Sequence, residues 1–202
     1  MSGTRATARR PRAARAPAER PAQILDAAAR VLLRDGVDAT IDGIAAEAGL
    51  GKGTVYEYFG SKAQVFTALR NRCNEQILAA GAAAVSAAPD APALDRVRRF
   101  VAGMLEFGVA NAALIGLLFH EAGIEERDEL GPIRAGLLDL VAQGVRGGEL
   151  AVEDPAFTVE FLLHGLHGVM ESALVDGLAA GSLLDRVDGV LVALLNPIRA
   201  QT

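Results

Sequence analysis

The sequence predicts an all-α protein. Hydrophobic residues make up 51% of the 202 positions, yet aromatic residues make up 4% and tryptophan is absent, so alanine and leucine carry the hydrophobicity and favour helix. Apolar side chains recur at the spacings of a helix, and alternating β-branched runs are missing. Glycine and proline separate the periodic segments. A chain of this length and hydrophobicity can bury a sizeable core, as one compact unit or two small ones.

Residues 1–19 are predicted to be a disordered basic arm. Alanine, proline and threonine separate its arginines, and Glu19 is its one acidic residue, so it has too little apolar surface to fold alone. Such an arm can lie along phosphates or enter a minor groove, and a solvated tail without defined contacts is the alternative. The arginines of the first twenty residues are Arg5, Arg9, Arg10, Arg12, Arg15 and Arg20.

A first helix is predicted from Pro21, and Gly36 is available to end it. Its apolar side chains recur at i, i+4, i+7 and i+8, which makes one continuous stripe for packing. The stripe consists of Ile24, Ala28, Val31 and Leu32. We expect this helix to brace the segment that follows.

Two short helices joined by a glycine turn are predicted between residues 40 and 59. Thr40 can cap the first one, because its hydroxyl accepts from an otherwise unpaired backbone N–H, and Asp42 adds negative charge at the positive end of the helix dipole. Gly49 can supply the positive φ of a tight turn. The apolar face of this first short helix is Ile44, Ala45 and Ala48. This arrangement is typical of a DNA-reading unit.

The second short helix has one face for packing and another for contact. Val55 and Phe59 are four residues apart and can face the core. The opposite face carries Lys52, Gly53, Tyr56 and Glu57. One face is therefore expected to pack and the other to read DNA.

A longer helix is predicted to begin after Ser61, which forms a capping box with Gln64. Lys62 lies in its first turn, where the helix dipole would prefer an anion, and this placement is explained if its true neighbour is an external phosphate. Lys52 and Lys62 are the only lysines in the chain.

The motif as a whole resembles the TetR family of bacterial transcriptional regulators. It comprises Gly36, Thr40, the run Ile44-Ala45-Ala46-Glu47-Ala48-Gly49-Leu50, the run Lys52-Gly53-Thr54-Val55-Tyr56-Glu57-Tyr58-Phe59, and Ser61-Lys62. The resemblance covers about Gln23 to Leu69. It implies an all-helical homodimer with an N-terminal three-helix helix-turn-helix DNA-binding head over 20–80 and a helical effector-binding and dimerisation domain over 81–202. A small-molecule effector and a double-stranded DNA operator are the implied partners.

Two kinds of DNA contact are expected. Lys52, Gly53 and Glu57 are expected to read base edges, which specify sequence. The expected phosphate contacts, which fix register, are Thr40, Thr54, Tyr56, Tyr58 and Lys62.

Two positions depart from the family pattern. Gly51 stands where relatives often carry serine, and glycine is still an acceptable helix cap. Glu57 stands where relatives more often present an aromatic, histidine or basic group. A carboxylate repels phosphate but can accept from the N4 amino group of cytosine, so Glu57 is expected to help choose a C·G pair, and a solvated rim charge is the alternative.

The charge is unevenly distributed along the chain. Residues 1–70 carry eleven basic and seven acidic groups, a net +4, whereas the remainder carries nine basic and eighteen acidic groups, a net −9. A DNA-binding end joined to an end that avoids DNA is expected to look this way, because phosphate attraction is then confined to one surface.

The rest of the chain is predicted to be helical, starting with a linking helix over about Ala63–Val85. A Ser/Ala/Pro segment then breaks the pattern. The following helices are expected at about Ala93–Ala110, Ala112–Ala122, Asp128–Arg146, Pro155–Gly177 and Leu183–Leu195. Asp154 is predicted to cap the fourth of these and Ser182 the fifth.

The last two helices are predicted to form a dimer interface. Apolar residues cover more than one face of the helix over 155–177, so one subunit can bury only part of it. Gly165, Gly168 and Ser172 would let another helix approach closely, and the last helix has a broad apolar stripe. We therefore expect a four-helix packing across a two-fold axis.

A ligand pocket is expected in the C-terminal part. An apolar pocket with a few polar groups would suit an organic effector, and ordinary core packing is the alternative for each apolar residue. The residues proposed for it are Phe100, Met104, Phe107, Phe119, His120, His164 and His167. Those histidines with Glu121 or Glu171 have metal-ligating side chains but no tight ligand spacing, so no metal or other cofactor is expected.

Other function classes find little support in the sequence. The one cysteine, Cys73, cannot form an internal disulfide, and no signal peptide or membrane span is recognised, so a cytoplasmic protein is expected. No nucleophile elbow, phosphate loop or paired-carboxylate motif indicates an enzyme. The sequence therefore predicts a ligand-responsive repressor that leaves a pseudo-palindromic operator when an effector binds. An architectural DNA binder without effector is the alternative, followed by a helical ligand-binding protein or an enzyme.

Overall fold

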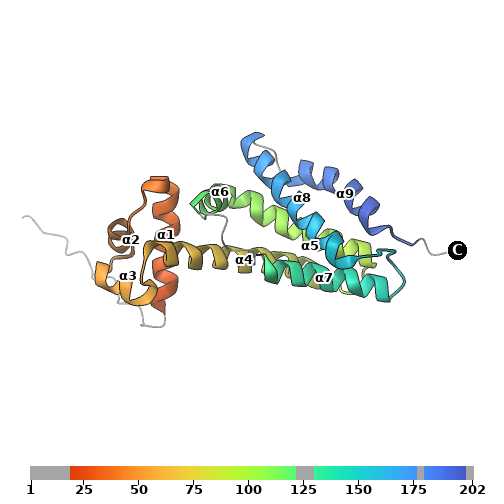
Figure 1. Ribbon diagram of the computed structural model, residues 1–202, viewed down its shortest axis with the longest axis horizontal. Coiled ribbons are helices and arrows are strands. Elements are labelled where there is room, and N and C mark those ends of the chain that lie inside the picture. Colours follow the sequence, from red (N-terminus) through yellow and green to blue (C-terminus); the bar gives the residue numbers. More distant parts are fainter. Residues whose placement is uncertain (1–18, 122–129, 177–179, 199–202) are drawn as a thin grey trace, which may run out of the picture.

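The computed structural model describes residues 19–121, 130–176 and 180–198, and the regular elements of these ranges are helices. An N-terminal head and a C-terminal body lie at opposite ends of the long helix α4 (Figure 1). The elements are α1 (Arg20–Asp35), η2 (Gly36–Asp38), α2 (Ile41–Ala48), α3 (Lys52–Phe59), α4 (Lys62–Ser86), α5 (Ala93–Ala110), α6 (Ala112–Glu121), α7 (Gly131–Arg146), α8 (Pro155–Asp176) and α9 (Ala180–Leu195). The predicted all-α class is confirmed.

The head consists of α1, η2, α2, α3 and the first half of α4, packed around one core. The predicted apolar stripe of α1 is buried, and α1 ends at Asp35, with Gly36 as its C-cap at a φ of 57°, which glycine adopts at little cost. Fully buried side chains from each of its four α-helices meet here, which fixes the positions of α2 and α3. They include Ile24, Leu32, Ile44, Val55 and Leu69.

Helix α4 belongs to both halves of the molecule. Val65 and Leu69 lie in the head core, whereas Ile77 lies in the body core. Farther along, α4 packs closely on α5 through two glycines. A Cβ at Gly81 would lie 2.9 Å from the Phe100 ring, and a Cβ at Gly103 would lie 2.6 Å from the carbonyl oxygen of Ala80. The two backbones thus approach closely where α4 enters the body.

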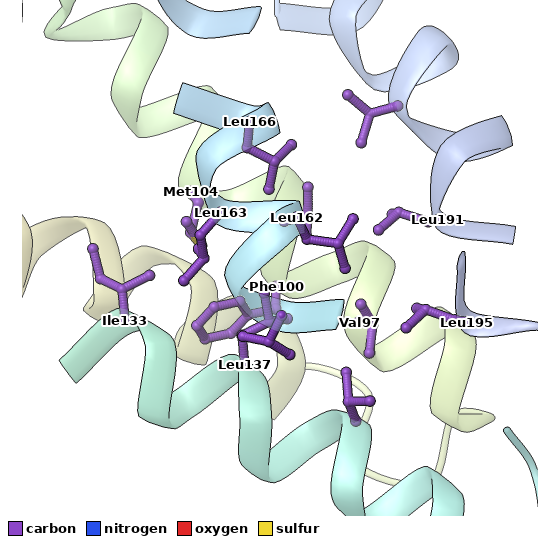
Figure 2. Packing of buried hydrophobic residues seen from close by; sticks show 14 of the residues in the cluster. Val97, Phe100, Met104, Ile133, Leu137, Leu162, Leu163, Leu166, Leu191 and Leu195 are labelled. Atoms are coloured by element: carbon purple, nitrogen blue, oxygen red, sulfur yellow. The ribbon is translucent and has the colours of Figure 1, made fainter. Parts of the chain in front are cut away.

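The body core lies between α5, α7, α8 and α9 (Figure 2). Phe100 and Met104 from α5 pack there with Leu137 of α7 and Leu163 of α8. Burial of these side chains is the main favourable term for the body. After α9, Ile198 N–H donates to the carbonyl of Glu149, which ties the end of the described chain to the α7–α8 connection.

Helix α6 contacts both cores. Ile115 lies in the body core, and Leu118, one turn later and 2% exposed, lies in the head core. Leu114 and Leu117 pack against the same head cluster. This contact was not predicted from the sequence, and it joins the head to the body at a second place besides α4.

Several predicted boundaries can be compared with the observed helices. α5 has the predicted bounds, and Asp154 caps α8 as predicted, its Oδ1 accepting from Phe157 N–H at 2.9 Å. The prediction that Ser182 caps the last helix is wrong, because α9 begins at Ala180 and Ser182 lies inside its first turn. α7 begins at Gly131, and the predicted start at Asp128 lies outside the described residues.

Within the described ranges, no single helix is long and apolar enough to cross a membrane. The pair Ala93–Ala110 and Ala112–Leu118, bent by 84°, passes that test of length and composition only when the two are taken together.

Candidate nucleic-acid interface

The turn between α2 and α3 has the predicted geometry. Thr40 is extended and its Oγ1 accepts from Gly43 N–H at 3.1 Å, so it caps α2. Gly49 closes the helix in the left-handed region, with a φ of 69°. Gly51, which has no side chain to offer, occupies the N-cap position of α3 in an extended conformation. These local choices place α3 across the end of the head (Figure 1).

Helix α3 divides into a packed face and an open face, as predicted. Val55 is fully buried and Phe59 packs against the head core. The predicted DNA-contacting residues on the other side are accessible, with Thr54 half-buried between the two faces. The exposed members are Lys52, Gly53, Tyr56, Glu57 and Tyr58. A Cβ added at Gly53 would meet nothing within 4 Å, so another molecule can approach its backbone.

Lys52 is held by a carboxylate from the neighbouring helix. Its Nζ lies 2.8 Å from Oδ2 of Asp42, and the hydrogen bond to this carboxylate raises the pKa of Lys52. The ammonium also lies 6.0 Å from the centroid of the Tyr56 ring. The sequence placed Asp42 at the positive end of α2 but did not reveal this pairing, which depends on how α2 and α3 cross.

Lys62 occupies a different environment at the start of α4. Ser61 caps that helix as predicted, its Oγ accepting from Gln64 N–H at 3.2 Å. The Lys62 ammonium donates to the carbonyl oxygen of Val37 at 3.1 Å and lies 5.4 Å from the centroid of the Phe66 ring. Lys62 therefore links α4 to the short helix η2.

Ion pairs brace α1 against α2 behind this surface. Arg30 Nε lies 2.6 Å from Oε1 of Glu47, and Arg34 Nη1 lies 3.4 Å from its Oε2. The hydrogen bond from Arg30 lowers the pKa of Glu47. Gln23 Nε2 donates to the carbonyl of Ala48 at 2.7 Å, at the end of α2. This brace was not predicted from the sequence, because its members are far apart along the chain.

Three of the residues proposed to bind ligand lie together in the body. Phe100 and Met104 are buried on α5, and Phe107 is partly buried one turn farther along. Phe119 and His120 belong to α6, but their side chains lie outside the described residues. Among the side chains that are described, no group of three His, Cys, Asp or Glu is placed to hold a metal ion.

The two histidines of α8 do not share one environment. His164 is exposed on the outer face of α8, and its Nδ1 lies 2.9 Å from the carbonyl oxygen of Glu160. His167 is half-buried. The structure therefore separates His164 from the cluster formed by Phe100, Met104 and Phe107.

Cys73 lies in the head core rather than in a reactive site. It is 5% exposed, and burial raises the pKa of its thiol. Because the thiolate is the reactive form, this environment suits a small core residue and agrees with the interpretation of the sequence.

Comparison with known proteins locates the same segment. The family model described as "Bacterial regulatory proteins, tetR family" matches residues 24–69, which run from α1 into α4. No curated protein matches the sequence significantly.

Solved structures resemble the whole arrangement of head and body. A TetR-family transcriptional regulator from Rhodococcus sp. has a TM-score of 0.74 at 22% identity, over 88% of this chain and 99% of the other. The fatty acid degradation regulator FadR from Bacillus halodurans has a TM-score of 0.70 at 19% identity, over 85% and 97%. PfmR of Thermus thermophilus, a TetR-family regulator, has a TM-score of 0.63 at 20% identity, over 88% and 99%. These likenesses establish the fold.

The matched segment is the one that carries the cap at Thr40, the left-handed turn at Gly49 and the open face of α3. It continues into a body of the same fold as solved TetR-family regulators. Residues 24–69 are therefore similar to the DNA-binding segment of TetR-family bacterial regulatory proteins, and they lie in a chain that has the fold of solved TetR-family regulators.

Proposed function

We propose that the protein is a ligand-responsive repressor that binds a pseudo-palindromic operator as a homodimer and is released by a small-molecule effector. The observation that carries the proposal is the exposed face of α3, which presents Lys52, Gly53 and Glu57 at the end of the head. The net positive charge of residues 1–70 comes from the arginines of residues 1–19, which precede α1. A short helix of this kind fits the major groove of B-DNA. Binding to the chromosome would place the protein in the cytoplasm.

In the proposed complex, α3 reads base edges and its surroundings hold phosphates. Lys52 and Glu57 contact bases, and the open backbone at Gly53 allows close approach. The phosphate contacts are Thr40, Thr54, Tyr56, Tyr58 and Lys62. The Thr40 oxygen accepts within the helix cap, and its hydroxyl hydrogen can still donate to a phosphate oxygen.

Exposed apolar side chains on α8 and α9 support the proposed dimer. Phe157 and Phe161 are 69% and 58% exposed, and Val190 of α9 is 48% exposed. A Cβ at Gly165 or Gly168 would meet nothing within 4 Å, so a second helix can lie close to α8. A surface of this kind favours a protein partner, and a second copy of the chain supplies a complementary one by symmetry.

The proposed effector is an organic molecule that enters the body between α5, α6 and α8. Phe100, Met104 and Phe107 form its apolar side, and Phe119, His120 and His167 are the further residues assigned to it. The exposed position of His164 on α8 favours the subunit interface over the pocket. Because α6 packs on both cores, a ligand that displaces α6 would also displace the head.

Selection of DNA by the full-length protein tests the proposal. Purified protein would be incubated with a genomic fragment library at physiological salt, and the retained fragments would be sequenced. A two-fold-symmetric motif is expected. Retention that is sensitive to salt but blind to sequence would favour an architectural DNA binder, and no retention would reopen the ligand-carrier or enzyme interpretation.

The recovered motif then allows a test of the effector. Candidate ligands would be added to the protein–operator complex, and release of labelled operator would be measured by fluorescence anisotropy. Fatty acids form a reasonable first probe class, because the similar FadR structure is described as that of a fatty acid degradation regulator. We expect at least one class of organic ligand to release the operator. If the protein retains the operator in the presence of every class, the proposed effector response is wrong.

A further inference from the structure

An acidic residue lies within the surface that is proposed to face DNA. Asp42 is the second residue of α2, its side chain is 69% exposed, and it pairs with Lys52 at the start of α3 at 2.8 Å. The Lys52 side chain is itself 50% exposed. The pair therefore bridges the two helices of the helix-turn-helix on its open side.

The pair contributes little to holding α2 and α3 together. Exposed ion pairs are screened by water and salt and add little to stability. The two helices are already fixed by the burial of Ile44 and Val55 and by the left-handed turn at Gly49. The pair therefore mainly determines where the Lys52 side chain lies.

Without Asp42, the Lys52 ammonium would have a less favourable electrostatic environment and a less defined position. It is the first residue of α3, where the positive end of the helix dipole repels an ammonium group. Its side chain is long and flexible, so an unpaired lysine would sample many positions. Asp42 counters this repulsion and favours the ammonium position that lies 2.8 Å from its Oδ2, between α2 and α3.

We propose that Asp42 is a positioning residue for sequence recognition, which aims the Lys52 ammonium at the base edges of a G·C pair. An ammonium group has three N–H donors, and the bond to Asp42 uses one of them. The remaining two match the O6 and N7 acceptors that guanine presents in the major groove. This inference rests on the proposed role of Lys52 in reading bases.

The same carboxylate lowers attraction for DNA of any sequence. It repels phosphates, whose attraction to positive groups supplies the sequence-independent part of DNA affinity. Asp42 therefore exchanges non-specific affinity for discrimination, as expected of a group that raises specificity by disfavouring the wrong partners.

The test uses the full-length protein, the operator recovered by selection, and a set of operators with each base pair replaced in turn. The variants are Asp42→Asn, Asp42→Glu, Lys52→Met and the double variant Asp42→Asn/Lys52→Met. Asp35→Asn is the matched control, because Asp35 pairs with Arg34 on α1 and its loss removes the same charge from the head. Affinities are measured over a range of salt concentrations, and circular dichroism checks folding.

Each variant is expected to change base preference or general DNA affinity in a different way. Lys52→Met removes the preference at one symmetric base pair, a discrimination of about 5-fold or more if the contact is bidentate. Asp42→Asn reduces the preference at that same pair, strengthens binding to non-operator DNA and steepens the salt dependence by up to about one charge. Asp42→Glu keeps the charge but moves the carboxylate, so it reduces the preference without strengthening non-operator binding. The double variant discriminates no less than Lys52→Met alone.

Two results would overturn the inference in distinguishable ways. If Lys52→Met alters the preference but both Asp42 variants leave it intact, Asp42 is only a surface charge and the reading role of Lys52 stands. If Lys52→Met leaves every preference intact, the proposed reading role fails and the inference fails with it. Should Asp42→Asn alone lose its fold, Asp42→Glu decides between these outcomes.

Discussion

The two lysines of the chain are held by different neighbouring groups, which bears on the DNA contacts proposed for them. Lys52 is paired with a carboxylate on α2, whereas Lys62 donates to the carbonyl of Val37 in η2. An exposed carboxylate can orient an ammonium toward a base edge. The Val37 carbonyl instead holds the Lys62 ammonium against the head, where the proposed phosphate contact would be made. We therefore expect base reading from Lys52 and phosphate binding from Lys62.

Replacing Lys62 with methionine is expected to weaken binding to every DNA sequence about equally. The reason is that a phosphate contact carries no base information, and its loss should make the salt dependence shallower by about one charge. Affinities for operator and non-operator DNA at several salt concentrations measure both effects. Thermal unfolding of the same variant measures how much stability is lost with the hydrogen bond to the Val37 carbonyl. A change in base preference alone would contradict the phosphate role.

Replacing Glu57 with glutamine is expected to change base preference at one symmetric position of the operator. A carboxylate accepts from the N4 amino group of cytosine, whereas the amide both accepts and donates and so tolerates other bases. Overall affinity should rise slightly because a charge that repels phosphate is lost. Selection of operators with the variant provides the measurement. If preferences at all positions match those of the parent protein, Glu57 is a solvated rim charge.

At the scale of single elements, most helix caps and turns could be predicted from a few consecutive residues. The caps at Thr40, Ser61 and Asp154 and the turn at Gly49 are set by a few consecutive residues, and the structure confirms each of them. Ser182 shows the limit of such signals. A serine ahead of an apolar run is a good cap, but α9 starts earlier, at Ala180.

Contacts between distant elements could not be predicted from the sequence. The Asp42–Lys52 pair requires the crossing angle of α2 and α3, and the pairing of Glu47 with Arg30 requires the docking of α1. The apolar pattern of α6 likewise indicates that the helix is buried, but it does not indicate which other helices cover it. Its contribution of Leu118 to the head core is a property of the folded chain.

Replacing Leu118 with alanine is expected to loosen the head, although Leu118 belongs to a helix of the body. Truncation of a fully buried leucine costs about 2–5 kcal/mol, because it removes apolar contacts and leaves a cavity. Hydrogen exchange should show lost protection in α1 and the first half of α4. Leu105→Ala, a buried leucine of the body core, is the control and should act on α5 and its neighbours. Loss confined to the body in both variants would refute the coupling.

At the scale of the whole molecule, the uneven charge of the chain divides into three parts. The excess of arginine lies in residues 1–19, residues 20–70 carry six basic and six acidic groups, and the remainder is acidic. The head carries the open face of α3, and the body has outer helices α8 and α9 that expose apolar side chains (Figure 1). The apolar excess on α8 was readable from the sequence, because its residues cover more faces than one subunit can bury. The face of α8 that stays exposed could not be predicted from the sequence, because it depends on how α8 packs against α7 and α9.

Replacing Phe161 with aspartate is expected to convert a dimer into a folded monomer. Phe161 is 58% exposed on α8, so the charge costs the subunit little, but it would be buried without a partner in the proposed interface. Sedimentation equilibrium should give half the parent mass with unchanged helical content. Because one head contacts only half of a palindromic operator, operator affinity should fall by about two orders of magnitude or more.

A matched variant separates this effect from the added charge alone. Ala82→Asp places the same charge on an exposed position of α4, outside the proposed interface, and should leave both mass and operator affinity near those of the parent. If Phe161→Asp also keeps the parent mass, then α8 is not the dimer interface. In that case the exposed phenylalanines must serve another partner, and the spacing between two heads on the operator would have to be set elsewhere in the molecule.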